Sequence, residues 1–130
     1  MREHGNFEMY IKGQTIVVDA MGAWNLETAL RWSDEYQKNV HLLAGKPWAC
    51  LVNLTQFELL VPEAWAHIKR YSQWSNEQNQ QYEAVVCGAS YQQALVEMIH
   101  EAIPNVDTQI FLNLGDAKSW LAHKGMFYEQ

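Results

Sequence analysis

The sequence has few positively charged residues for its length. Nine Lys and Arg stand against fifteen Asp and Glu in 130 residues, so the formal net charge is −6 at pH 7. A partner that binds the phosphate backbone of a nucleic acid needs clustered cations. The longest basic cluster here is Lys69-Arg70. We therefore expect no nucleic-acid partner.

Long apolar runs are also missing. No run approaches the roughly eighteen apolar residues of a membrane span, and the first ten residues, MREHGNFEMY, contain no apolar signal core. The 48% hydrophobic and 18% charged composition is that of an ordinary globular protein. These features predict one soluble, cytoplasmic domain over residues 1–130, with no membrane span.

Cysteine is nearly absent. Cys50 and Cys87 are the only two, and each lies in an apolar run, WACLV or AVVCG. Neither has the C-x-x-C spacing of a redox pair. We predict that both are buried, reduced thiols on neighbouring strands of a sheet.

What the chain does contain is an alternation of strand and helix patterns. Its order is β-β-α-β-α-β-α-β-α, which predicts an α/β layered domain with a mostly parallel mixed sheet and an antiparallel first strand at or near one edge. The strands are expected at 7–12, 15–20, 48–52, 82–88 and 108–112. The helices are expected at 25–44, from 62 to about 75, from 90 to about 102 and from 113 to about 125.

Local signals mark the ends of these elements. Gly13 suits a hairpin turn, Asn25 a helix N-cap and Pro62 the first turn of a helix. Ser90 with Gln93 has the spacing of a capping box.

Helical spacing predicts which side chains of the first helix face the core, namely Leu26, Ala29, Leu30, Tyr36, Val40 and Leu43. Two of the six tryptophans, Trp48 and Trp120, fall on predicted core faces. The other four lie at helix ends or flanks and fit either core or surface.

The element order and several local stretches resemble the STAS domain, and more narrowly the SpoIIAA-like proteins of bacteria that are related to anti-sigma factor antagonists. The stretches are the opening hairpin, PWACLVNLTQF at 47–57 and DAKSWLAHKG at 116–125. The resemblance implies a STAS-like fold and a non-enzymatic role in protein interaction or regulation. We predict no cofactor.

The residues after the third predicted strand resemble the antagonist family only in part. Asn53-Leu54-Thr55 is similar to that family's Asp-Leu-Ser-like turn. Where the family has Asp-Ser-Ser-Gly, with a serine that a partner kinase phosphorylates, this chain has VPEA at 61–64. The acceptor serine is missing, so the resemblance predicts a constitutive domain. Glu63 there either complements the helix dipole, which we favour, or imitates phosphate permanently.

We expect the working site in a loop at 53–62 and at the start of the next helix, with Phe57 and Trp65 as anchors for a protein partner or a second copy of the chain. Its residues are Asn53, Thr55, Phe57, Glu58, Pro62, Glu63 and Trp65. An alternative is a carrier or sensor whose apolar pocket holds a lipid-like or other small ligand.

A weaker alternative is an enzyme that uses His67 or a carboxylate. Glu63 and His67 are four residues apart on one helix, but a catalytic zinc needs three protein ligands and nothing local offers the third. We interpret the pair as a solvated contact and predict no catalytic residue and no metal site.

Overall fold

The computed structural model describes residues 5–88 and 90–129, apart from the side chains of residues 90–93, 95 and 96. The predicted order of elements is confirmed. The elements are β1 (Gly5–Lys12), β2 (Thr15–Trp24), α1 (Leu26–Leu43), β3 (Trp48–Leu60), α2 (Pro62–Asn76), β4 (Gln80–Val86), α3 (Ser90–Ala102), β5 (Asp107–Phe111) and α4 (Leu114–His123).

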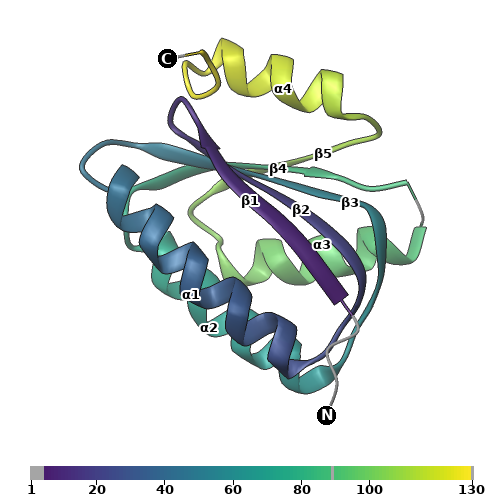
Figure 1. The fold of residues 1–130 in the computed structure, drawn as a ribbon. Coiled ribbons are helices and arrows are strands. Elements are labelled where there is room, and N and C mark those ends of the chain that lie inside the picture. The colour runs from purple at the N-terminus through teal and green to yellow at the C-terminus, as the bar shows by residue number, and fades with distance from the viewer. Residues whose placement is uncertain (1–4, 89, 130) are drawn as a thin grey trace.

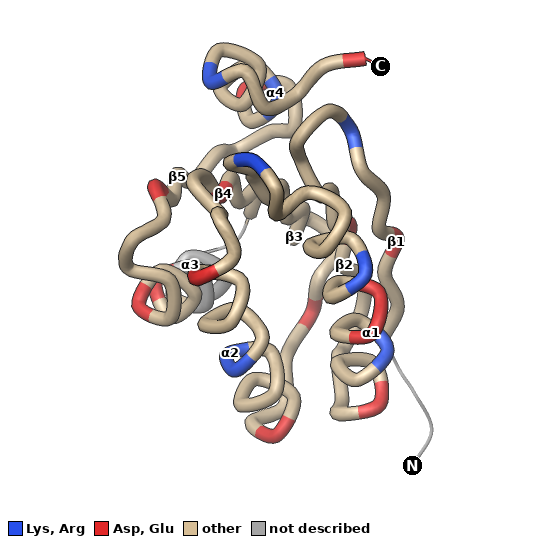
Figure 2. Tube along the Cα trace, turned by 90° about the vertical axis from the view of Figure 1, so that its left-hand side faces the viewer, with Lys and Arg blue, Asp and Glu red and all other residues tan. Residues whose placement is uncertain are grey.

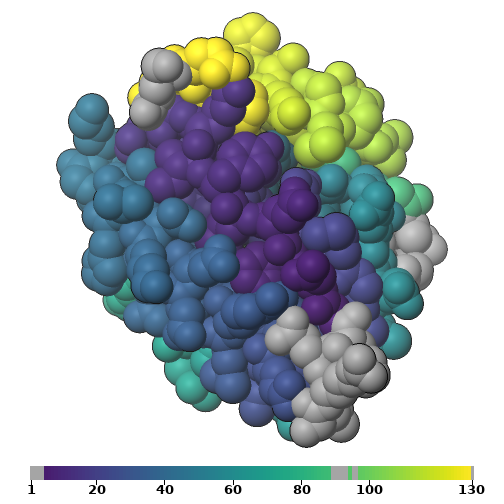
Figure 3. Space-filling view, viewed as in Figure 1, coloured from purple at the N-terminus to yellow at the C-terminus, as the bar shows by residue number. Residues whose placement is uncertain are grey.

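The strands form one sheet in the order β1-β2-β3-β4-β5. β1 and β2 are antiparallel, and the remaining neighbours pair in parallel. Gly13 has a φ of 63° in the turn between β1 and β2, a conformation that glycine adopts without steric cost. The mixed sheet with an antiparallel first strand at its edge is confirmed. In the space-filling view that edge strand lies at the surface between α1 and α4 (Figure 3).

Helices cover both faces of the sheet (Figure 1). α1, α2 and α3 lie on one face, which we call the three-helix face, and α4 alone lies on the other, the α4 face. Alternate residues of each strand point to opposite faces. Thus Ile16 and Val18 pack in the core of the three-helix face, whereas Val17 packs under α4.

The core beneath α1 and α2 is large and rich in aromatic side chains. Its buried members include Phe7, Trp24, Trp32, Tyr36, Trp48, Cys50, Phe57, Val85 and Cys87. The core of the α4 face is built from small and aliphatic residues, Val17, Ala49, Leu51, Ala84, Val86, Ala117 and Leu121. Trp120, which we predicted for the core, is only partly buried and packs against this second cluster.

The thiol prediction is confirmed for burial and only in part for placement. Cys50 lies on β3, whereas Cys87 directly follows the neighbouring strand β4 and is not part of it. Both are buried and free.

The N-cap predicted for the first helix is confirmed, and the prediction of its core-facing residues is partly wrong. Asn25 accepts a hydrogen bond from the Thr28 amide (3.1 Å) and so caps α1. Ala29, Tyr36, Val40 and Leu43 are buried as predicted. However, Leu26 and Leu30 are 36% and 45% exposed, and Trp32 is buried on the inward face in addition. The capping box expected at Ser90 and Gln93 lies outside the described side chains.

Charged residues do not gather on one element. In Figure 2 the Lys and Arg positions are spread over α1, α2, α4 and the connecting segments. No helix within residues 5–88 and 90–129 is long and apolar enough to cross a membrane.

Candidate functional site

The segment that we expected to be a loop is strand. β3 continues beyond residue 52 to Leu60, and it pairs with β2 over that whole length. The loop prediction was wrong because two irregularities hide the strand's period. Between the pairs Asn53–Asp19 and Gln56–Met21, β3 has two residues where β2 has one. A second register shift follows at Gly22, whose φ is 74°.

Such bulges turn side chains to the other face of the sheet. Leu54, Phe57 and Leu60 therefore lie three residues apart and all point to the three-helix face, where they line one pocket. Thr55 and Glu58, between them, are exposed. A strand read with a strict period of two would have brought Gln56 and Glu58 to that face instead.

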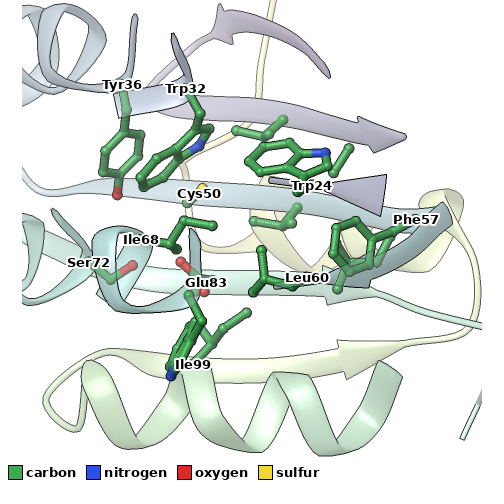
Figure 4. Close-up of a pocket in the computed structure, with 15 residues that line it drawn as sticks. Trp24, Trp32, Tyr36, Cys50, Phe57, Leu60, Ile68, Ser72, Glu83 and Ile99 are labelled. Carbon is green, nitrogen blue, oxygen red and sulfur yellow. The ribbon is translucent and has the colours of Figure 1, made fainter. Parts of the chain in front are cut away.

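The pocket lies between the sheet and the helices of the three-helix face, and we call it the aromatic pocket (Figure 4). Its volume is about 80 Å³ and it is partly open. The described lining comprises Val18, Ala20, Trp24, Trp32, Tyr36, Cys50, Val52, Leu54, Phe57, Leu60, Trp65, Ile68, Ser72, Glu83 and Ile99. Nearly all of these side chains are apolar, so the pocket favours an apolar occupant.

Burial separates the floor of the aromatic pocket from its mouth. The lining residues on β2, α1 and β4 are buried. The lining residues on α2 and α3, namely Trp65, Ile68, Ser72 and Ile99, are only partly buried. We call the side of the described lining that α2 and α3 form the mouth of the pocket.

One carboxyl lies on the floor of this apolar pocket. Glu83 is 5% exposed, and its carboxyl is placed centrally among the labelled side chains in Figure 4. Gln80 Nε2 donates a hydrogen bond to Glu83 Oε1 (3.0 Å). The residues described supply no Lys, Arg or His partner for this carboxyl.

A chain of polar side chains leads from α1 to Glu83. Tyr36 donates its hydroxyl hydrogen to Ser75 Oγ (2.9 Å), and that oxygen lies 3.1 Å from Gln80 Oε1. Gln80 in turn holds Glu83. These buried groups satisfy one another, which fixes the position of the carboxyl at the pocket floor.

Burial controls the protonation of the pocket. It raises the pKa of Glu83 to about 7, against the smaller lowering effect of the Gln80 hydrogen bond. Burial, with the Glu83 charge as a further cause, also raises the pKa of the Cys50 thiol well above its ordinary value. Cys50 is therefore a neutral thiol near neutral pH, whereas Glu83 exchanges between neutral and charged forms.

Glu83 was not among the residues that we selected from the sequence, although a signal was there. It interrupts the apolar run at 82–88, which we predicted to be a buried strand. A carboxyl within such a run is either turned to solvent or buried, and a buried carboxyl is a candidate for function.

The residues that we did select fall into three groups. Phe57 and Trp65 line the aromatic pocket. Glu58, Pro62 and Glu63 are exposed around the end of β3 and the start of α2. Pro62 is the first residue of α2, as predicted.

The third group, Asn53 and Thr55, lies away from the aromatic pocket. Asn53 Nδ2 donates to Asp19 Oδ1 (3.0 Å), and Asn53 Oδ1 accepts from the Thr55 amide (3.1 Å) and hydroxyl (2.9 Å). These bonds stabilise the first bulge of β3. Asn53 and Asp19 also line a second, more polar hollow with Glu8 and Gln56.

The interpretation of His67 as a solvated contact of Glu63 was wrong. His67 is 9% exposed, and its Nε2 lies 2.8 Å from Ser33 Oγ on α1. Burial, then the nearby Arg70, lowers its pKa. His67 thus joins α2 to α1 as a largely neutral side chain. The described side chains contain no group of three or more His, Cys, Asp or Glu placed to hold a metal ion.

Comparisons with known proteins identify the fold. No protein-family model matches the sequence, and no curated protein matches it either. Among solved structures, an uncharacterized protein of the DUF3478 family with a SpoIIAA-like fold, from Shewanella loihica PV-4, matches with a TM-score of 0.74 and 16% identity, over 93% of this chain and 98% of that one. An anti-sigma factor antagonist from Mycobacterium paratuberculosis matches with a TM-score of 0.60 and 13% identity, over 89% and 92%. This chain has the SpoIIAA-like fold, as the sequence resemblance implied.

Proposed function

We propose that this chain is a STAS-like regulatory domain that works by binding, and that it binds a small apolar ligand in the aromatic pocket. The observation that carries the proposal is the pocket itself, with its aromatic lining and its partly buried side formed by α2 and α3. Phe57 and Trp65, which we had expected to anchor a protein partner, line this pocket. The role of a cytoplasmic sensor or carrier is part of the proposal.

The chemistry of the pocket favours binding over catalysis. A nucleophilic cysteine needs a lowered thiol pKa, whereas burial raises that of Cys50. His67, the residue that we considered for an enzyme, bonds to Ser33 and is not among the residues that line the pocket.

Closing the pocket tests the proposal. Ser72 lines the mouth and is partly buried, and the adjacent Gln73 is exposed on the same helix. We expect native mass spectrometry of freshly purified protein to detect a retained apolar molecule. Ser72→Trp should abolish retention because an indole fills the mouth, whereas Gln73→Trp should keep it. Equal retention by both variants would place the ligand elsewhere, and failure of the unaltered protein to retain any added short-chain alcohol would contradict the proposal.

A second candidate function is a contact with a protein partner or a second copy of the chain. The end of β3 and the start of α2 favour this candidate, because Glu58, Leu59 and Glu63 are exposed there. Leu59, an apolar side chain, is 52% exposed. The absence of a phosphorylated switch is part of this candidate, because no hydroxyl is present at positions 61–64. Sedimentation at micromolar concentration would reveal a dimer, and only a monomer near 15.1 kDa would count against self-association.

A further inference from the structure

The aromatic pocket combines two features that an uncharged ligand does not need. The first is the Glu83 carboxyl, which is 95% buried and has no cationic partner within the described residues. A buried carboxylate costs several kcal/mol unless another group pairs with it. A ligand that supplied the missing cation would remove that cost.

The second feature is the number of aromatic side chains around the carboxyl. Five of the described lining residues are aromatic, Trp24, Trp32, Tyr36, Phe57 and Trp65. In Figure 4, Tyr36, Trp32 and Trp24 lie in a row above the carboxyl of Glu83, and Phe57 lies to its right. The Trp32 and Tyr36 rings stack on each other at 4.6 Å between centroids. Aromatic faces attract cations, most strongly where water is excluded.

We propose that the aromatic pocket binds a small organic ammonium ion, whose charge pairs with Glu83 and whose apolar substituent packs against the aromatic side chains. This rests on the proposed function, since it names the chemical class of the ligand for the same pocket. Glu83 then selects the ligand, and Gln80 positions the carboxyl through its hydrogen bond.

The size of the pocket limits the ligand. A cavity of about 150 Å³ holds one benzene molecule, so a pocket of about 80 Å³ encloses an ammonium group with only a few carbon atoms. The remainder of a longer chain would extend between Trp65 and Ile99 at the mouth. Butylammonium, 1-butanol and butyrate therefore make a matched set of probes that differ in the polar group alone.

The protonation of Glu83 makes the binding depend on pH. The ammonium ion pairs only with the ionised carboxylate, so its affinity falls as the pH falls through about 7. Two other titratable groups of the lining face Glu83, Tyr36 from α1 and Cys50 from β3, and both have raised pKa values and stay neutral. α2 and α3 contribute no titratable side chain to the described lining.

Calorimetric titration of the full chain with the three probes near pH 8 tests the inference. We expect butylammonium to bind at least about tenfold more tightly than 1-butanol, with butyrate weakest, because a hydrogen bond to a charged group exceeds one to a neutral group by about that factor. Glu83→Gln should remove the preference for butylammonium. Glu35→Gln, at an exposed position on α1, should keep it.

The carboxyl ¹³C signal of Glu83 in the unaltered protein gives a second readout that does not depend on a variant's folding. Saturating butylammonium should lower the midpoint of its titration by at least about one pH unit, and 1-butanol should not. If 1-butanol binds as tightly as butylammonium and the midpoint stays in place, the ammonium inference is wrong while the apolar pocket stands. If none of the three probes binds, both proposals fail.

Discussion

The two faces of the sheet have very different cores, although the same strands contribute side chains to both. The core of the α4 face contains small aliphatic residues from β2, β3, β4 and α4, without an ionisable side chain among its buried members. The core of the three-helix face contains aromatic residues, a buried carboxyl and a chain of hydrogen-bonded polar groups next to an open pocket. The core of the three-helix face thus carries features that packing does not require, and the core of the α4 face does not.

Truncating one leucine on each face should give the largest difference in unfolding free energy between the two faces. Leu121 is fully buried in the α4 core, so Leu121→Ala should cost about 2–5 kcal/mol of unfolding free energy. Leu60 is partly buried and already borders the pocket, so Leu60→Ala should cost less than about 2 kcal/mol. Urea unfolding measures both. Equal losses would mean that the two faces are packed alike.

Stability should depend on pH through the three-helix face. The pKa of Glu83 in the folded protein, about 7, lies above its ordinary value of 4.5. The contribution of Glu83 to the unfolding free energy is therefore fully present below about pH 4.5 and is lost as the pH rises through about 7. The difference corresponds to about 3 kcal/mol, on the order of 1.4 kcal/mol for each pH unit.

The unfolding free energy of the unaltered protein should therefore fall relative to that of Glu83→Gln as the pH rises. Between about pH 4 and pH 9, this relative loss should amount to a few kcal/mol. Glu58→Gln serves as the exposed control on β3. A difference that stays constant over this range would show that Glu83 is ionised and compensated in the folded protein.

We expect the smallest change in unfolding free energy from a substitution outside both cores. Glu63 lies exposed in the first turn of α2, where a carboxylate complements the helix dipole. Glu63→Gln should lower the unfolding free energy by about 0.3–1 kcal/mol and leave ligand binding unchanged. A loss of binding in this variant would restore the idea that Glu63 imitates a phosphate group.

The sequence predicts the architecture well because its signals are local. The Gly13 turn, the Asn25 cap and Pro62 at the start of α2 each act within a few residues, and the apolar runs at 48–52 and 82–88 mark the buried strands. The candidate site was harder to predict. The bulges of β3 depend on its pairing with β2, so the segment from Asn53 to Leu60 lacks a strand period and resembles a loop.

The same limit applies to the pocket. Phe57 and Trp65 were selected from the sequence as anchors, but their common pocket forms only when α2 packs against β3. Glu83 was missed because its place in the apolar run at 82–88 does not tell a buried carboxyl from an exposed one. Its burial depends on how α1 and α2 cover the sheet. His67 likewise bonds to Ser33, which precedes it by 34 residues.

Methyl NMR spectroscopy tests the central claim, that the three-helix face holds the binding site, most directly. On addition of 1-butanol, we expect shifts at the methyl groups of Val52, Leu60, Ile68 and Ile99, which line the aromatic pocket. The methyl groups of Val17, Leu51 and Leu121, in the core of the α4 face, should stay in place. Shifts confined to the α4 face, or spread equally over both faces, would contradict the claim.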